Sequence, residues 1–547
     1  MPLPSAHVDT FARDHLPAPG DLPQTFFSLA TLQFPERVNC AAGILERQLA
    51  AGNGAHTAIL APGVRWTYGD LNARANRIAR VLVEDFGIVP GNRVLLRGPN
   101  NPMMAACWFA VLKTGAIAVA TMPLLRARDL APIISKAQIN LALCDTRLTQ
   151  ELNQAHADSL PFPIVEFDGT DAAATTAELN VRMRGKQDTF ACVDTARDDV
   201  ALIAFTSGTT GMPKGTLHFH GDVLAMNATA GTYAFGIQPD DVIIGSPPLA
   251  FTFGLGALLT FPLSVGATTV LLESISAPDL LQGMNQYQAT VCATAPTAYR
   301  AMLRHMGGPP PPSLRRCISA GEHLPLETFE HWRDKTGISI MNGLGTTEML
   351  HMFVAAVGAG IRPGSAGKAL PGYEIRILGP DGAPLPPGKQ GRLAVRGPTG
   401  CKYLADARQR DYVVDGWNLT GDICSMDAEG YLWYGSRADD MIISSGYNIS
   451  GPEVEQALLP HPAVLECAVV AAPDRERGQV VKAFIVPAPG YTAGPDLTRI
   501  LQDLVKGSIA PYKYPRLIEY VESLPKSPTG KLQRNVLRAM AAAFPPP

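Results

Sequence analysis

The sequence predicts an α/β protein with a large N-terminal domain, a small barrel-like β part and a small α+β domain at the C-terminal end. The first observation is length, because 547 residues exceed the about 250–300 that a single hydrophobic core can organise. The second is that short β-branched runs alternate with longer apolar runs over most of the chain, which is typical of parallel sheets covered by helices. The third is a change of pattern beyond Gly372.

Strand and helix patterns can be told apart by length in the first part of the chain. The runs "NRVLLRGP" (Asn92–Pro99) and "TTVLLE" (Thr268–Glu273) are short and predict buried strands. The run "PMMAACWFAVLKTG" (Pro102–Gly115) is longer and ends in a glycine, so it predicts a buried helix that stops near Gly115. We therefore expect mixed or parallel sheets in a large domain of residues 1–436.

The segment "GYEIRILGPDGAPLPPGKQGRLAVRG" (Gly372–Gly397) has a different pattern. Two strand-like runs flank an Asp-Gly turn, and no helical run separates them. This order predicts an antiparallel, barrel-like piece at the end of the large domain.

A polar segment, "GSRADDMIISSGYNIS", follows Tyr434 and predicts a linker. Beyond it, "PEVEQALLP", "ECAVVAAP" and "VVKAFIVP" have helix and strand patterns of their own. We place a domain boundary near Arg437 and expect a small α+β domain of residues 437–547.

The stretch from Val242 to Leu272 contains no charged residue and is long enough to span a bilayer. Pro247, Pro248 and Pro262 would break one continuous helix, however. A turn, a buried helix and a buried strand explain the stretch better, so we expect no membrane association.

Composition narrows the class of function. The net charge of −3 gives no basic footprint for nucleic acid. Nine cysteines without C-x-x-C spacing indicate reduced thiols in the cytoplasm rather than a metal cluster, and the N-terminus has no apolar signal-peptide core. The oligomeric state is left open, with a homodimer as one option.

The segment "TSGTTGMPKG", which begins at Thr206, follows the strand-like run "DVALIAF". Its glycines let the backbone approach an anion closely, its hydroxyls are donors, and Lys214 adds a positive charge. The order of residues differs from a Walker A loop. Composition alone leaves a flexible linker and a phosphate-binding loop equally open.

Six motifs in order resemble the adenylate-forming superfamily, which comprises acyl- and aryl-CoA synthetases, adenylation domains and luciferases. The first is the segment at Thr206. The other five are "SAGEHLP" (Ser319–Pro325), "NGLGTTEM" (Asn342–Met349), "LTGD" (Leu419–Asp422), "SRADDMIISSGYNIS" (Ser436–Ser450) and "PKSPTGKLQR" (Pro525–Arg534). The resemblance covers nearly the whole chain and favours the phosphate-loop interpretation.

The resemblance implies that a carboxylic acid and ATP form an acyl-adenylate, which the thiol of coenzyme A then attacks. Because the carboxylate and the α-phosphate are both anionic, such a site mainly positions them and neutralises charge. Glu348 is the implied Mg²⁺ ligand and Thr347 the implied α-phosphate contact. The implied ATP-binding residues are Thr206, Ser207, Gly208, Thr209, Thr210, Gly211, Lys214, Gly321, Glu322, His323, Asn342, Gly343, Leu344, Gly345, Thr346, Asp422 and Arg437. Leu344 stands where the family usually has a tyrosine that stacks on adenine.

The resemblance also implies a mobile C-terminal domain. Lys531 would be the catalytic lysine that bridges the carboxylate and the α-phosphate during adenylation. Asp439 matches the family's hinge residue. Rotation about it would withdraw Lys531 and bring Gly446 and Tyr447 to the path of the CoA thiol.

The runs "PPLAFTFGLGALLTFP" and "TTEMLHMF" resemble benzoate-type CoA ligases, and "SAHVDTFARDHLP" resembles 2-aminobenzoate-CoA ligases. The implied acid-binding residues are Phe251, Thr252, Phe253, Phe261, Gly345, His351 and Met352. Such a set predicts a flat apolar slot for one aromatic ring. The alternatives are that Phe253 and Phe261, eight residues apart, are one face of a core helix and that His351 is a core histidine.

The sequence thus predicts an aryl-CoA ligase that uses ATP, Mg²⁺ and coenzyme A, with benzoate or 2-aminobenzoate as the acid. Two alternatives stay open. The acceptor could be a carrier protein, or the chain could be an inactive nucleotide-binding regulator. Retention of Glu348, Asp422 and Lys531 argues against the regulator.

Overall fold

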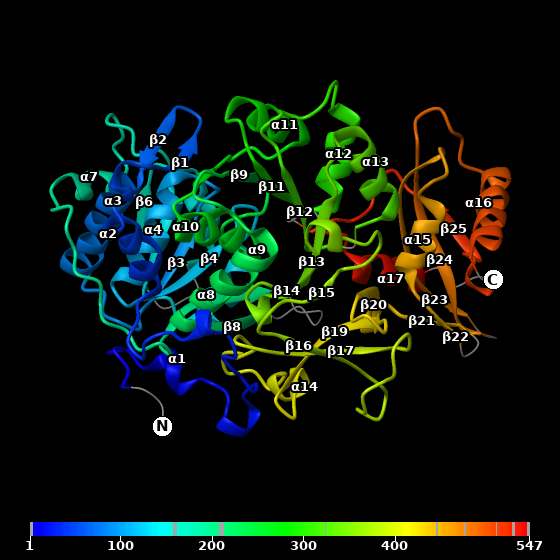
Figure 1. Cartoon of the computed structure of the whole chain (residues 1–547), viewed down its shortest axis with the longest axis horizontal. Coiled ribbons are helices and arrows are strands. Elements are labelled where there is room, and N and C mark those ends of the chain that lie inside the picture. Colours follow the sequence, from blue (N-terminus) through cyan, green and yellow to red (C-terminus); the bar gives the residue numbers. More distant parts are fainter. Residues whose placement is uncertain are drawn as a thin grey trace.

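The computed structural model describes residues 4–156, 161–206, 213–322, 324–444, 447–474, 477–509, 511–527 and 531–543. Four β-sheets organise these residues (Figure 1). Two large sheets and their helices form the bulk of the N-terminal domain. A half-barrel follows them in the chain, and an α+β domain lies at the C-terminal end, so the predicted fold class is confirmed.

The first sheet has six strands in the order β6-β5-β3-β4-β7-β8. All neighbours are parallel except the hairpin of β7 and β8. Its strands are β3 (Arg93–Arg97), β4 (Ile117–Thr121), β5 (Leu141–Asp145), β6 (Ile164–Phe167), β7 (Val200–Thr206) and β8 (Lys214–Phe219).

The second sheet has nine strands in the order β15-β14-β13-β12-β11-β9-β10-β1-β2. Its centre is parallel, and antiparallel strands close both edges. Its strands are β1 (Thr57–Ala61), β2 (Val64–Thr67), β9 (Val242–Gly245), β10 (Thr268–Val270), β11 (Val291–Thr294), β12 (Arg316–Ser319), β13 (Ile340–Gly345), β14 (Met352–Ala355) and β15 (Lys368–Ala369).

Helices between the two sheets share one apolar cluster with both of them. They include α3 (Tyr68–Arg80), α4 (Pro102–Lys113), α8 (His220–Met226), η7 (Asn227–Phe235), and the run of α9 (Thr252–Leu255), η8 (Gly256–Thr260) and α10 (Phe261–Val265). Helix α4 is buried along its whole length, is capped by Asn101 and ends before Gly115, whose φ is +71°. This is the buried helix that the sequence predicts.

Each sheet carries a second helical layer on its outer face. Helices α5 (Ala127–Ala137) and α6 (Thr149–His156) pack on the first sheet. Helices α11 (Ala277–Gln286), α12 (Pro296–His305) and α13 (Leu326–Thr336) pack on the second. Because both sheets are covered on both faces, their central strands are largely apolar.

The half-barrel is an antiparallel sheet in the order β16-β17-β19-β18, with β20 paired to β19. Its strands are β16 (Glu374–Leu378), β17 (Gln390–Arg396), β18 (Val413–Val414), β19 (Trp417–Met426) and β20 (Leu432–Arg437), and the short helix α14 (Gln409–Tyr412) precedes β18. The antiparallel pairing of β16 with β17 confirms the strand–turn–strand prediction.

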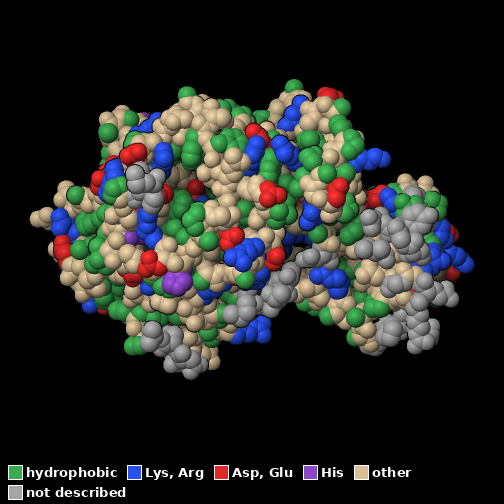
Figure 2. Space-filling view, turned by 90° about the horizontal axis from the view of Figure 1, so that it is seen from below, with side chains coloured by type: hydrophobic (Ala, Val, Ile, Leu, Met, Phe, Trp, Pro, Cys, Tyr) green, Lys and Arg blue, Asp and Glu red, His purple; other side chains and the backbone are tan. Residues whose placement is uncertain are grey.

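The C-terminal α+β domain has a five-stranded sheet with its own apolar clusters. Its elements are β21 (Ile442–Ser444), β22 (Tyr447–Ile449), α15 (Gly451–Leu458), β23 (Val464–Asp474), β24 (Gly478–Pro487), α16 (Pro495–Ser508), β25 (Leu517–Tyr520) and α17 (Arg534–Ala543). Figure 2 shows this domain as a smaller mass joined to the large body, with Lys and Arg side chains beside the junction.

Two predictions about chain organisation have different outcomes. The charge-free stretch forms a strand, a turn, a buried helical run and a strand, as expected. The polar segment after Tyr434 is less of a linker than predicted, because β20 extends to Arg437 and pairs with β19 there. The boundary between residues 436 and 437 stays a prediction. Within the described residues, no helix is both long and apolar enough to cross a membrane.

One buried histidine of the N-terminal core gives a pH prediction. His220 is fully buried, its Nδ1 accepts the backbone N–H of Cys40 at 3.2 Å, and burial lowers its pKa to about 3. The folded protein therefore holds this ring neutral, while the unfolded chain protonates it below its ordinary pKa of 6.5. This contribution to stability is complete above pH 6.5 and is lost as the pH falls toward 3.

We predict that His220→Asn flattens the acid side of the stability profile. Relative to the variant, the wild type should lose about 1.4 kcal/mol of unfolding free energy per pH unit below the pKa of the unfolded state. Urea unfolding at about pH 7, 6 and 5 measures the difference. Parallel profiles for the two proteins would contradict a neutral buried ring.

Candidate active site

The predicted phosphate segment lies in the hairpin between β7 and β8. Thr206 ends β7 and pairs across the hairpin with Lys214, which begins β8. Residues 207–212 lie outside the described residues, so the predicted contacts of Ser207, Gly208, Thr209, Thr210 and Gly211 stay predictions. The described strand β7 ends at Thr206, at the carboxyl end of the first sheet, an edge where backbone N–H groups can meet an anion.

Glu348 lies on a tight turn between β13 and β14. Residues Thr347–Met349 form one 3₁₀ turn, and the side chain of Thr346 caps it by accepting the backbone N–H of Met349 at 3.2 Å. Leu350, which follows, has a φ of +67°. A left-handed conformation in a buried leucine is strained, and here it reverses the chain so that β14 can pair with β13.

A tyrosine that the sequence did not single out holds the Glu348 carboxylate. The hydroxyl of Tyr403 donates to Oε1 of Glu348 at 2.6 Å, and Lys214 Nζ lies 3.4 Å from the same hydroxyl oxygen. The predicted phosphate-binding lysine and the predicted metal ligand therefore share one contact.

Asp422 and Arg437 form an ion pair across β19 and β20. Arg437 Nη1 donates to Asp422 Oδ1 and to the backbone oxygen of Thr420, both at 2.9 Å. Burial raises the pKa of Asp422, and the Arg437 guanidinium opposes this. Although the sequence predicted a linker here, the paired strands bring the two residues together as the ribose motif requires.

Unpaired polar atoms gather beside the predicted adenine segment. Ser319 and Asn342 are register partners on β12 and β13. Among the described residues, neither Ser319 Oγ nor Asn342 Oδ1 has a hydrogen-bond partner, and both atoms are buried. Gly321, two residues after Ser319 in the chain, has a φ of +88°. Buried polar atoms without partners cost stability, so this edge is suited to receive the polar groups of a ligand such as a nucleotide.

Lys531 reaches this edge from the C-terminal domain. A methyl group added to Gly321 would lie 3.7 Å from Cε and 3.9 Å from Nζ of Lys531. Lys531 keeps solvent-exposed surface. Partial withdrawal from water lowers the pKa of its ammonium group, Glu322 and Glu348 oppose that shift, and Arg437 adds to it. Burial likewise raises the pKa of Glu322. Lys531 of the C-terminal domain thus lies beside the predicted adenine segment of the N-terminal domain.

The predicted acid-binding residues include a buried aromatic cluster centred on His351. Ring centroids of Phe261, Phe235 and Phe253 lie 4.6, 5.6 and 5.8 Å from that of His351. Burial lowers the pKa of His351 to about 3, so the ring is neutral. Neither ring nitrogen has a hydrogen-bond partner within the described part of the chain. His351 is therefore buried like a core residue, but its polar atoms are unsatisfied.

Glycines leave the space that this cluster occupies. A Cβ on Gly256 would lie 2.5 Å from Cδ2 of His351 and 2.8 Å from Cζ of Phe261. Gly256 begins the π-helical turn η8 between α9 and α10. This turn changes the helical register between Phe253 and Phe261, and both still contact the same histidine.

The remaining acid-pocket predictions fall around this cluster. Phe251 and Thr252 line a small cavity at the start of α9, together with Trp108 and side chains of β4 and β7. Met352 packs on Gly343 and Gly345, since a Cβ on either glycine would overlap it.

Some of the predicted site residues lie outside the described part of the chain. His323 and Gly446 are not described, and only the backbone of Asp439 and Tyr447 is. The sequence also missed Phe235 and Tyr403. Phe235 ends a helical run without any motif, and Tyr403 lies in a segment without a repeated pattern, so neither had a local signal.

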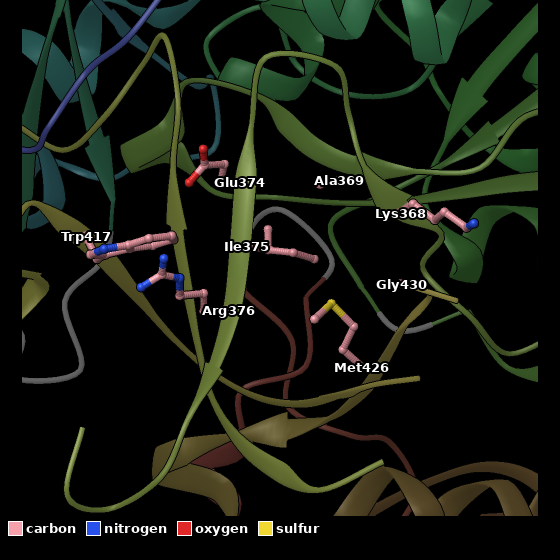
Figure 3. Close-up of a pocket in the computed structure, with 8 residues that line it drawn as sticks. All are labelled: Lys368, Ala369, Glu374, Ile375, Arg376, Trp417, Met426 and Gly430. Carbon is pink, nitrogen blue, oxygen red and sulfur yellow. The ribbon is translucent and has the colours of Figure 1, made fainter. Parts of the chain in front are cut away.

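A wider surface depression of about 390 Å³ lies on the half-barrel, away from these motifs (Figure 3). Its lining residues are Lys368, Ala369, Glu374, Ile375, Arg376, Trp417, Met426 and Gly430. Arg376 lies over the ring of Trp417, with 4.4 Å between the guanidinium carbon and the ring centroid. None of these eight residues belongs to the predicted site.

Comparisons with known proteins agree with this arrangement. The family model "AMP-binding enzyme" matches residues 45–403, and "AMP-binding enzyme C-terminal domain" matches residues 453–531. A benzoate–CoA ligase of Thauera aromatica is 36% identical, over 93% of this chain and 97% of the relative.

Two solved structures are similar along almost their whole length. An anthranilate CoA ligase in complex with anthranoyl-AMP has a TM-score of 0.87 at 32% identity, covering 94% of this chain and 99% of its own. A benzoate CoA ligase from Burkholderia xenovorans has a TM-score of 0.84 at 30% identity, covering 92% and 100%.

The two family models match parts of both domains, and the relatives match nearly the whole chain. The chain therefore belongs to the AMP-binding enzyme family and is an AMP-forming acid–CoA ligase that uses ATP and coenzyme A.

Proposed function

We propose that this enzyme converts a single-ring aromatic acid, benzoate or 2-aminobenzoate, to its CoA thioester through an acyl-adenylate. The observation that carries the proposal is the aromatic cluster around His351, which directly follows the Glu348 turn in the chain. A carboxylate held near Glu348 would have its ring against this cluster. The anthranilate and benzoate ligases among the similar proteins support the same class of acid.

The chemistry of the cluster favours a ring over an alkyl chain. Phenylalanine edges and faces provide stacked and T-shaped contacts for a flat substrate. The neutral His351 ring has one N–H donor and one acceptor nitrogen, and either could pair with an amino substituent. Thr252 could accept from an ortho amine in the same way. A fatty acid offers no polar group to satisfy these atoms.

The nucleotide proposal assigns a part to each charged residue. Ser319 and Asn342 offer polar atoms to adenine beside Gly321, and Asp422 accepts from the ribose hydroxyls with Arg437 fixing its orientation. Thr347 and Lys214 face the phosphates. Apolar packing of Leu344 takes the place of an aromatic stack.

The carboxylate of Glu348 suits a hard divalent cation held jointly with substrate phosphates. Bound there, Mg²⁺ would neutralise phosphate charge. Tyr403 engages one oxygen of this carboxylate. Among the described residues, the other oxygen has no hydrogen-bond partner, so the residues present fit the ion.

For the second half-reaction we propose rotation of the C-terminal domain, residues 437–547, about Asp439. The pose described here has Lys531 beside Gly321 and Glu322, which suits adenylation. Rotation would remove Lys531 and bring Gly446 and Tyr447 to the thiol path. Free CoA is the proposed acceptor, and a carrier protein stays the alternative.

The test of this function is thioester formation across substituted benzoates and medium-chain fatty acids. We expect kcat/KM to be highest for benzoate or 2-aminobenzoate. A methylene-sized misfit in such a pocket costs about 1–3 kcal/mol, so closely related rings should differ about 10- to 200-fold. A fatty acid that outperforms every benzoate would overturn the aromatic proposal and leave the ligase activity standing.

Gly256→Ala should disturb the ring pocket from the helix side. The new methyl overlaps His351 and Phe261, and overpacking of this kind costs about 1–3 kcal/mol of unfolding free energy. We also expect a raised KM for benzoate. Gly507→Ala, at a helical glycine with open space around it, is the matched control and should cost nothing. Equal stability and equal KM in both variants would count against the packed cluster.

Lys531→Ala should separate the two half-reactions. Loss of one preorganised charge contact slows a step by about 10²–10³-fold, so adenylate formation should fall by that much. Thioester formation from supplied benzoyl-adenylate should be spared. Lys526→Ala, which removes a surface lysine paired with Glu466, controls for general effects on this segment. Single-turnover rates of adenylate formation and of thioester formation provide the test. Equal slowing of both steps would refute the proposed rotation of the C-terminal domain.

A further inference from the structure

We propose that Tyr403 is a positioning residue that sets the orientation of Glu348 and its distance from Lys214. The inference rests on the proposed part of Glu348 as the Mg²⁺ ligand. No sequence motif pointed to Tyr403, and the contacts below carry the proposal.

Tyr403 stands between the two charged side chains. Its hydroxyl proton goes to Glu348 Oε1 at 2.6 Å, a length typical of a charge-assisted O–H···O⁻ bond. Its hydroxyl oxygen can then accept from Lys214 Nζ at 3.4 Å, and the same ammonium lies 5.1 Å from the ring centroid. One hydroxyl thereby links a carboxylate on the second sheet to a lysine on the first.

The backbone around Tyr403 is fixed from both sides. Residues 399–404, which we call the bridging segment, run beside β8. Leu217 donates to the oxygen of Lys402 at 2.7 Å, and Leu404 donates to the oxygen of Gly215 at 2.8 Å. The buried Gln409 side chain accepts the backbone N–H of Tyr403 at 2.8 Å.

The bridging segment also contacts the Glu348 turn. Thr399 donates from Oγ1 to the backbone oxygen of Met349 at 2.9 Å. The Tyr403 ring packs edge-on against Tyr412 at 5.7 Å, and the Tyr412 hydroxyl lies 3.3 Å from Thr346 Oγ1. Tyr403 is 1% exposed, so water has little access to this side chain.

This arrangement explains how a glutamate on a short turn keeps one orientation. A glutamate side chain loses appreciable rotamer entropy when it is ordered. Tyr403 orders Glu348 before any ligand arrives and fixes Oε1, so that the other oxygen is left to coordinate a cation. Groups that orient metal ligands in this way typically change metal affinity by about 10- to 100-fold when they are removed.

The test is Tyr403→Phe, which keeps the ring and removes only the hydroxyl. Binding of Mn²⁺ together with a non-hydrolysable ATP analogue is followed by electron paramagnetic resonance, without any acid present. We expect the dissociation constant of Mn²⁺ in this complex to rise about 10- to 100-fold. The Mg²⁺ concentration at half-maximal ATP–pyrophosphate exchange should rise in parallel, while thioester formation from supplied benzoyl-adenylate is spared.

Tyr68→Phe is the matched control. Tyr68 is fully buried and donates to the backbone oxygen of Ala267 at 2.6 Å, the same length as the Tyr403 bond. It should cost similar thermal stability and leave Mn²⁺ affinity unchanged. If Tyr403→Phe does not fold, Tyr403→Met is the second variant, with the same expected loss.

A double-mutant cycle with Glu348→Gln shows whether Tyr403 acts through Glu348. In the Glu348→Gln background, Tyr403→Phe should cause no further loss of Mn²⁺ affinity. Additive losses, or unchanged Mn²⁺ affinity in Tyr403→Phe alone, would overturn the inference. Because this readout needs no acid, an enzyme that binds Mn²⁺ and nucleotide normally yet rejects all benzoates would refute the proposed substrate and leave the Tyr403 inference intact.

Discussion

The hydrogen bond between Tyr403 and Glu348 lies where three parts of the fold meet, and the Tyr403 hydroxyl contacts a charged side chain from each of the other two. Tyr403 lies between β17 and β18 of the half-barrel, Glu348 lies on the turn between β13 and β14 of the second sheet, and Lys214 begins β8 of the first. Each sheet is rigid by itself because it is packed on both faces. What the bond adds is a defined distance between their ends, which the proposed triphosphate and metal ion would have to match.

The proposed acid pocket and the proposed phosphate region differ in whether their polar groups already have hydrogen-bond partners. In the proposed phosphate region, Tyr403 contacts both Glu348 and Lys214 before a ligand binds. Around His351, polar nitrogens are buried without partners within the described residues. A substrate that paired these nitrogens in the proposed pocket would gain part of its binding free energy by satisfying them. The strained Leu350 lies between these two regions and turns the chain from one to the other.

Local patterns in the sequence were enough for much of the fold. The buried helix α4 has a proline start, an apolar run and a terminal glycine, and the β16–β17 pair has its turn signal. Neither depends on distant contacts. The secondary structure of Arg437 was harder to predict, because its charge and polar neighbours suggest a linker. In the structure, pairing with Asp422 on β19 extends β20 to include Arg437.

The functional residues also fall into two groups, those that local motifs reveal and those that only the folded structure reveals. Motif order identified Glu348, Asp422, Arg437 and Lys531, and the structure brings them to one region. Phe235 and Tyr403 could not be identified so, since their parts come from contacts with residues more than fifty positions away. No local pattern contains such information, and a lone tyrosine or phenylalanine is most often ordinary core.

The close packing of glycines on Phe261 also bears on how related enzymes can diverge. A Cβ on Gly231 would lie 3.0 Å from one edge of this ring, and a Cβ on Gly256 would lie 2.8 Å from its tip. A larger residue at position 231 needs a smaller one at position 261. A larger residue at position 256 needs room at both 261 and 351, because its Cβ would also lie 2.5 Å from Cδ2 of His351. Positions 231, 256, 261 and 351 should therefore covary across the family, and the acid that each member accepts should follow the combination rather than any one residue.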